Sequence, residues 1–339
     1  MLKVVNAPHI FASGLKLTKR GEASQIQLSK DEVLTLLSLS FFGLMEYKKT
    51  DFTELFKNTE FSRCLCHYYI WAFKQASCSS WYTKYLTIER RVLLEKIHWQ
   101  KRKIQLNDLS IIDKHKGIED FRDCIQVNFA DPMPGGTLPS AVGDIVQEEI
   151  LFLIYPELFV TCLLVPKLGD RESLAVHGLH RISNYEGYQT TFKWTGMFFD
   201  DSNEITIIFM DALIGGATDK KTLDRQLNKA FIAFSVTDSK PIATGNWGCG
   251  AFGGSFHQTA IIQLMAAAQA GVTLKYTTFS SKYMQGFELF YLSMIKNKIT
   301  VKEMYTALVS LLLTKSVISF SSVEEFILKD RFYKELGSL

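Results

Sequence analysis

Two adjacent glutamates are the residues of this sequence best placed to do acid/base chemistry. Glu148 and Glu149 follow the Pro/Gly loop DPMPGGTLPSAVGD and precede the strongly apolar run ILFLI. Carboxylates at a helix start also have a purely structural explanation, because the helix dipole favours each by about 0.5 kcal/mol. Here the glycines and the apolar flank indicate that one carboxylate faces a semi-enclosed cleft. Desolvation there would raise its pKa toward the range useful for proton transfer.

The second chemical feature is a loop, GNWGCGAFGG, with five glycines between residues 245 and 254. Such a backbone approaches a ligand closely, and the helix expected after it favours a phosphate. Gly248 to Gly253 form a literal GxGxxG, but a nicotinamide-type dinucleotide site needs an acidic residue about 20 positions later. None occurs between Gly254 and Glu288. The loop therefore predicts a diphosphate cradle rather than a hydride-transfer site.

The elements that must position these loops alternate between strands and helices after residue 118. This alternation predicts an α/β core with a mixed or parallel sheet, whose ligands bind at the carboxyl ends of the strands. The expected strands are CIQVNFA, FVTCLLVP, ITIIFMDAL and LKYTTF, and the expected helices are VQEEILFLIYPEL, KTLDRQLNKAFIAFS, HQTAIIQLMAAAQAG and 298–313.

The first third of the chain has a different pattern. Residues 1–25 look irregular, and an N-cap serine with acidic residues in the first turn predicts a helix from Ser29. Further helices are expected at 60–76 and 80–87, and strands within 88–115.

Composition excludes several classes of function. The chain has 339 residues and a net charge of +3, which gives no bulk electrostatic case for binding DNA or an anionic membrane. No membrane span and no secretory signal are expected. The six cysteines form no CxxC pair, and the seven histidines have no metal-ligand spacing. This usage is typical of reduced thiols in an intracellular protein without a metal site.

The two loops, in this order, resemble the poly(ADP-ribose) glycohydrolase family, whose signature is a triple glycine, a short spacer and QEE. The resemblance extends from QIQLSKDEVLTLLSLSFFGL to about residue 295 and is strongest in VQEEILFLIYPEL, NYEGYQTTFKW, DRQLNKAFIAF and ATGNWGCGAFGG. It implies an α/β, macrodomain-like mixed sheet flanked by helices in a catalytic domain at 118–339. A mainly helical accessory region would occupy 1–117.

The resemblance also implies a reaction and its residues. Glu149 matches the catalytic acid, which would protonate the leaving ribose oxygen through an oxocarbenium-like transition state and then activate water. Glu148 matches the neighbour that positions ribose hydroxyls. The full set is, for catalysis, Glu149, Glu148 and Asn128; for the adenine edge, Ile118 and Glu119; for stacking on adenine, Phe279; for closure over the substrate, Tyr188; and for the remaining contacts, Asp131, Gly135, Gly136, Gln147, Asn246, Gly248, Cys249, Gly250, Ala251, Phe252 and Gly253.

Several positions depart from the family pattern. The family strand reads VDFAN, whereas here it is VNFAD. Asn128 thus stands where the family has an Asp, and Asp131 stands where the family has an Asn. Asp131 can accept from ribose hydroxyls but cannot donate, and at close range its charge would raise the pKa of Glu149. The triple glycine reads PGGT, with Pro134 and Thr137 flanking the pair, and Ser255 replaces an Asp usual after GAFGG.

Three hypotheses follow. The first is a glycohydrolase that releases ADP-ribose from poly(ADP-ribose), without cofactor or metal. The second, favoured by the departures, is a macrodomain that binds ADP-ribose but hydrolyses the polymer poorly. The third is a dinucleotide-dependent oxidoreductase, which the missing acidic residue disfavours. The expected partner is poly(ADP-ribose) or ADP-ribose, including polymer on modified proteins. We expect a nuclear or cytoplasmic monomer that binds neither DNA nor membranes directly.

Overall fold

The computed structural model describes residues 16–44, 52–78, 81, 83–112, 116–136, 138, 145–198, 204–236 and 238–336. Thr137 and the spacer at 139–144 lie outside them, as does most of the segment expected to be irregular at 1–25. The chain divides into two compact units, one formed by residues 1–92 and 128–209 and the other by 93–127 and 210–339. This division differs from the expected boundary at 117/118, because segment 1–92 packs with 128–209. The functional division into accessory region and catalytic domain stays a prediction.

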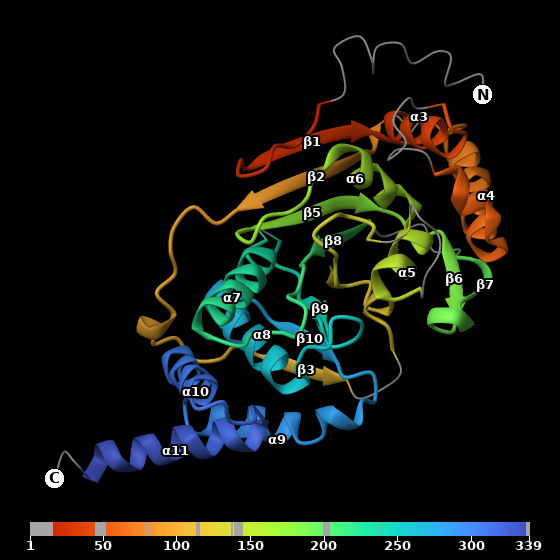
Figure 1. Ribbon diagram of the computed structural model, residues 1–339. Helices are drawn as coiled ribbons and strands as arrows, with labels where there is room; N and C mark the ends of the chain where they lie inside the picture. Colours follow the sequence, from red (N-terminus) through yellow and green to blue (C-terminus); the bar gives the residue numbers. More distant parts are fainter. Residues whose placement is uncertain are drawn as a thin grey trace. The chain divides into compact units, whose positions relative to one another are not determined.

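The first unit contains four antiparallel strands in the order β1-β2-β5-β8 (Figure 1). Strand β2 shows clean alternation, with Leu86, Ile88 and Arg90 buried and their neighbours partly exposed. The expectation of a helix at 80–87 is therefore wrong: the period-2 pattern already begins at Tyr85. The strands are β1 Ser24–Ser29, β2 Tyr85–Val92, β5 Glu172–Leu179 and β8 Ile205–Phe209.

Helices of the first unit pack into a continuous apolar core with this sheet. Ser29 and Glu32 form the capping box that starts α3, as the sequence predicted. The helices are α3 Lys30–Phe41, α4 Thr59–Gln75, α5 Gln147–Ile154 and α6 Phe159–Leu164, with 3-10 turns at η2 Thr53–Lys57 and η7 Pro156–Leu158. A separate two-stranded hairpin joins β6 Ser183–Glu186 to β7 Lys193–Met197 through the turn η8 Gln189–Thr191.

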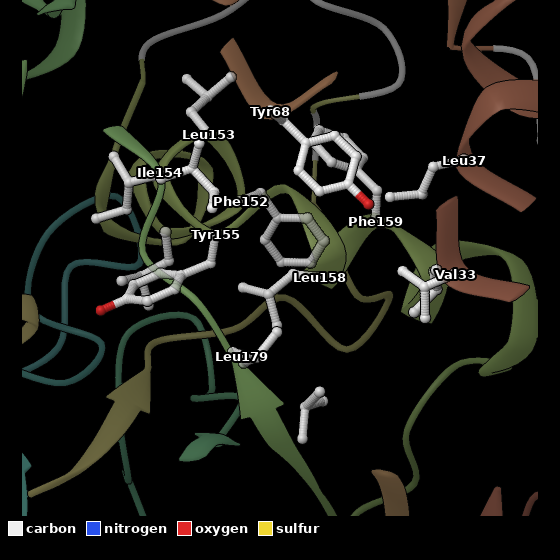
Figure 2. Close-up of a cluster of buried hydrophobic side chains, with 14 of the residues drawn as sticks. Val33, Leu37, Tyr68, Phe152, Leu153, Ile154, Tyr155, Leu158, Phe159 and Leu179 are labelled. Atoms are coloured by element: carbon white, nitrogen blue, oxygen red, sulfur yellow. The ribbon is translucent and has the colours of Figure 1, made fainter. Parts of the chain in front are cut away.

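Aromatic side chains fill much of this core. Figure 2 shows Phe152 of α5 beside Leu158 and Phe159. The ring centroids of Phe152 and Phe159 are 5.3 Å apart. The segment FVTCLLVP is the helix α6 and not the expected strand. Because nearly all of its side chains are buried, its apolar run carried no periodicity that separates helix from strand.

The second unit contains four parallel strands in the order β4-β9-β10-β3. The expected helices over 221–235, 257–271 and 298–313 and the strands at CIQVNFA and LKYTTF are confirmed. The strands are β3 Leu109–Ile112, β4 Ile125–Asn128, β9 Ile242–Thr244 and β10 Leu274–Thr277. The helices are α7 Lys220–Phe234, α8 Phe256–Ala270, α9 Phe287–Lys296, α10 Val301–Leu313 and α11 Phe320–Leu336. The 3-10 turns are η4 Trp99–Lys101, η5 Ile118–Asp120 and η9 Lys282–Met284.

Strands and helices of both units together confirm the α/β class. The N-terminal region is not only helical, since it contributes β1 and β2. Within the described ranges, no helix is long and apolar enough to cross a membrane. The same part of the chain contains no group of three or more His, Cys, Asp or Glu side chains suited to a metal ion.

Candidate active site

The QEE triplet forms the first turn of α5. Val146 is the extended N-cap residue, and Gln147, Glu148 and Glu149 are the first three helical residues. A Glu149 carboxylate oxygen accepts the backbone N–H of Val146 at 3.2 Å and so satisfies one donor at the helix start. The expectation of a helix whose first turn carries both glutamates is confirmed.

Glu148 holds the segment that follows β4. Its Oε2 accepts the backbone N–H of Asp131 at 2.7 Å, and its Oε1 accepts the N–H of Gly135 at 3.1 Å and the side-chain amide of Asn128 at 3.2 Å. Gln147 supports the same segment, because its Oε1 accepts the N–H of Phe129 at 2.8 Å. The first turn of α5 therefore fixes the path of residues 128–136.

Burial dominates the electrostatics of Glu148. Its side chain is buried, and desolvation raises the pKa of this carboxyl well above its usual range, although its N–H donors favour the charged form. The neighbouring charge of Glu149 acts in the same direction as desolvation. Glu149 is also buried, with 6% of its surface exposed. Both carboxylates thus lie in a low-dielectric setting suited to proton transfer.

The two glycines of the PGGT loop are required by the structure. Gly136 has φ +52°, and a Cβ there would lie 3.0 Å from Oε2 of Glu148 and 3.0 Å from Oε1 of Glu149. Gly135 has φ +88°, and a Cβ there would lie 2.7 Å from Sγ of Cys162. The backbone at Gly136 therefore approaches both carboxylates at once, which glycine permits without strain.

The exchanged Asn and Asp have different surroundings. Asn128 is fully buried and donates to Glu148, while its Oδ1 has no hydrogen-bond partner within the described residues. Asp131 is half-buried, and its Oδ1 accepts the N–H of Met133 at 2.8 Å in a local turn. An influence of Asp131 on the pKa of Glu149 stays a prediction.

The glycine-rich loop of the second unit is a compact turn before α8. Gly248 has φ +71°, and a Cβ there would lie 2.6 Å from Cβ of Ala212. Gly254 donates to the carbonyl of Gly248 at 2.9 Å, and Gly253 to that of Gly250, also at 2.9 Å. The backbone N–H groups of Gly250, Ala251 and Phe252 donate no hydrogen bond to any part of the chain that the structure describes. A run of such N–H groups before a helix is an arrangement that binds anions.

Asn246 connects this loop to the end of β10. Its Nδ2 donates to the carbonyl of Thr278 at 3.0 Å, and its Oδ1 accepts from the hydroxyl of Tyr276 at 3.3 Å. Phe279 follows directly, half exposed and with φ +52°. A bulky residue in the left-handed region is strained, and such strain gathers at functional sites. Burial raises the pKa of the Cys249 thiol to about 12, so that Cys249 lines the loop as a neutral group.

Ile118 and Glu119 lie in η5 and are both buried. The Glu119 carbonyl accepts the side-chain amide of Gln126 at 3.4 Å. The Thr277 hydroxyl donates to the carbonyl of Lys116 at 2.9 Å, which places η5 beside the strand end that leads to Phe279. The proposed adenine-binding residues thus come from neighbouring segments.

Tyr188 lies in the turn of the β6–β7 hairpin, where 42% of its surface is exposed. Its backbone N–H donates to the Thr191 hydroxyl at 2.9 Å.

Within the first unit the structure thus brings the QEE triplet together with residues 128–136 and places Tyr188 on its own hairpin. Within the second unit it brings Asn246 and the glycine-rich loop next to Phe279. Sequence reasoning missed Cys162 and Ala212, which pack against these loops, because a small side chain far away in the chain gives no local signal.

Comparison with known proteins decides the family. Residues 96–286, more than half of the chain, match the family model described as poly(ADP-ribose) glycohydrolase, Macro domain fold. The chain belongs to the poly(ADP-ribose) glycohydrolase family. Membership of this family confirms the macrodomain-like α/β fold and makes the chain a hydrolase of the glycosidase class.

Relatives of the glycohydrolase family occur in plants and animals. The chain is 26% identical to the probable poly(ADP-ribose) glycohydrolase 2 of Arabidopsis thaliana, over 88% of this chain and 71% of that protein. It is 34% identical to poly(ADP-ribose) glycohydrolase 1 of Caenorhabditis elegans, over 53% of this chain and 26% of the nematode protein. Among solved structures, the Deinococcus radiodurans poly(ADP-ribose) glycohydrolase mutant in complex with ADP-ribose is 14% identical. It covers 59% of this chain and 95% of its own, with a TM-score of 0.40.

Proposed function

We propose that this chain hydrolyses the ribose–ribose O-glycosidic bonds of poly(ADP-ribose) and releases ADP-ribose. The observation that carries the proposal is the pair of buried glutamates at the start of α5, approached by the backbone of Gly136, in a member of the glycohydrolase family. Two adjacent buried carboxylates are costly to retain without a use.

In this mechanism Glu149 gives its proton to the leaving ribose oxygen as the glycosidic bond breaks and the anomeric carbon becomes oxocarbenium-like. The Glu149 carboxylate then takes a proton from the water that attacks this carbon, which restores the acid. We assign to Glu148 the positioning of ribose hydroxyls. Its hydrogen bonds to Asp131 and Gly135 support a second role in shaping the ribose side of the site. No cofactor takes part in these steps.

Further residues are assigned to the rest of ADP-ribose. We assign the diphosphate to the N–H groups of residues 250–252 and to the start of α8. The exposed ring of Phe279 would stack on adenine, next to Ile118 and Glu119, and Tyr188 would close over the substrate. We further propose a monomer acting in the nucleus or cytoplasm on polymer that is free or attached to proteins, without binding DNA or membranes.

A second candidate function is binding of ADP-ribose without efficient turnover. The observation in its favour is Asp131, which stands where the family has an Asn that hydrogen-bonds the ribose, and whose carboxylate cannot donate.

One experiment separates the two. ADP-ribose release from purified poly(ADP-ribose) is measured for the wild type, for Glu149→Gln and for the exposed control Glu22→Gln, with ADP-ribose binding followed by calorimetry. The hydrolase predicts turnover in the wild type and the control and a loss of at least about 100-fold in Glu149→Gln. Binding without release in all three would establish the second function.

A further inference from the structure

The hairpin that carries Tyr188 has little stability of its own. Strands β6 and β7 pair only with each other among the described strands, and they have four and five residues. Two-stranded hairpins of this length are marginal in water, so that their position depends on what they pack against.

Helix α4 supplies that support through its contacts with Trp194 of β7. The backbone N–H of Trp194 donates to Oε2 of Glu60 at 2.7 Å. The indole ring stacks on the imidazole of His67, with centroids 4.3 Å apart and planes 11° apart. The indole N–H donates to the Ser183 hydroxyl at 3.2 Å, which ties the two hairpin strands together through the same side chain.

Both α4 groups are themselves fixed. Glu60 and His67 are seven residues apart and therefore lie on one face of the helix. Glu60 lies in the first turn, where the Asn58 side chain caps its N–H at 2.9 Å and Arg63 pairs with its other carboxylate oxygen at 2.8 Å. Burial lowers the pKa of His67, so that a neutral ring stacks on the indole. The opposite face of α4 is buried in the core of the unit through residues such as Leu65.

We propose that Glu60, His67 and Trp194 are positioning residues that hold the Tyr188 hairpin against α4, so that a helix of the N-terminal region tunes ADP-ribose binding. Glu60 orients the backbone of β7, and the His67–Trp194 stack fixes the hairpin's inclination. We assign none of the three a contact with the substrate. The inference rests on the proposed function only in assigning Tyr188 to the substrate.

A double-mutant cycle tests whether these three residues act through Tyr188. ADP-ribose affinity and the split between KM and kcat are measured for Trp194→Ala, His67→Ala and Glu60→Ala, each in the wild-type and in the Tyr188→Ala background. We expect each single change to raise Kd and KM about tenfold with kcat nearly unchanged, and to have less than about a twofold effect once Tyr188 is absent. Trp194→Phe, which keeps a stacking ring, and Lys74→Ala, on the exposed surface of α4, are expected to stay within about threefold of the wild type.

Two results would overturn the inference. One is an equal loss of affinity in both backgrounds, which would mean that the three residues act on folding and not through Tyr188. The other is unchanged ADP-ribose affinity in Tyr188→Ala. Because the readout includes binding, the test works whether or not the chain turns over polymer. A failure of the proposed hydrolysis would appear separately, in the Glu149→Gln comparison. If Trp194→Ala does not fold, the cycle with His67→Ala decides.

Discussion

The backbone N–H of Asp131 donates to Oε2 of Glu148 at 2.7 Å, so that the start of α5 and the segment after β4 are joined at a buried carboxylate. Glu148→Ala removes the acceptor for this donor and for the N–H of Gly135. Each buried donor left without a partner costs about 1–3 kcal/mol. We therefore expect the free energy of unfolding to fall by about 3 kcal/mol, measured by urea denaturation. Glu148→Gln, which keeps one acceptor oxygen, should lose less; an equal loss would contradict a hydrogen-bonding role.

The approach of Gly136 to both carboxylates predicts an effect on activity beyond its effect on stability. Gly136→Ala introduces a left-handed alanine, which costs about 1–2 kcal/mol, and a Cβ that must displace both carboxylates. Each carboxylate must give way by a few tenths of an ångström. Because a displacement of a catalytic group by about 1 Å lowers turnover about 100-fold, we expect this smaller shift to lower it about tenfold. The matched control is Gly271→Ala, since Gly271 has φ +73° and open space around its Cβ position. ADP-ribose release should fall about tenfold only in the first variant, and similar activities in the two would refute the claim.

Asp131→Asn tests the exchanged pair. Asn keeps the Oδ1 that accepts from Met133 and gains an N–H donor for a ribose oxygen, while a charge near the glutamates is removed. One added hydrogen bond is worth about 1 kcal/mol, so that kcat/KM for polymer should rise about fivefold. Asn128→Asp is the opposite change and removes a donor to Glu148. A drop in kcat/KM for Asp131→Asn would mean that the carboxylate has a role of its own.

A buried ion pair joins α3 to the turn after α5. Lys30 Nζ lies 2.8 and 2.6 Å from the two carboxylate oxygens of Glu157, and both side chains are buried. Glu157→Gln leaves the ammonium unpaired, and we expect a loss of about 3–5 kcal/mol in unfolding free energy. The double variant Lys30→Met with Glu157→Leu should recover most of it. Chemical denaturation of the three proteins measures both terms, and a double variant as unstable as the single one would refute this account.

The same ion pair predicts that the stability of the fold depends on pH. Although burial alone would raise it, Lys30 and His180 hold the pKa of Glu157 below its usual value of 4.5. The stability from this shift is fully present above pH 4.5 and is lost as pH falls through the lower folded pKa. Urea unfolding below pH 4.5 should therefore weaken the wild type more than the double variant. Parallel curves for the two would show that other carboxylates dominate.

Local sequence signals were enough to predict several elements of the fold and of the candidate site. The capping box at Ser29, the two glutamates starting α5 and the glycine-rich loop before α8 were readable because caps, periodicity and glycine act within a few residues. The same signals failed for α6 and for the strand from Tyr85. A wholly buried apolar run has no periodicity, whereas the alternation from Tyr85 onward was present in the sequence and the expected helix at 80–87 overlapped its beginning.

Only the tertiary structure decided how these parts support one another. The hydrogen bond from Trp194 to Glu60 spans 134 residues, and that from Asp131 to Glu148 spans 17. The contact of Gly136 with both carboxylates depends on the fold in the same way. A residue type and its spacing fix which hydrogen bonds a side chain is able to make. Which partner it meets is set by packing of distant segments, where burial removes water as the competing partner.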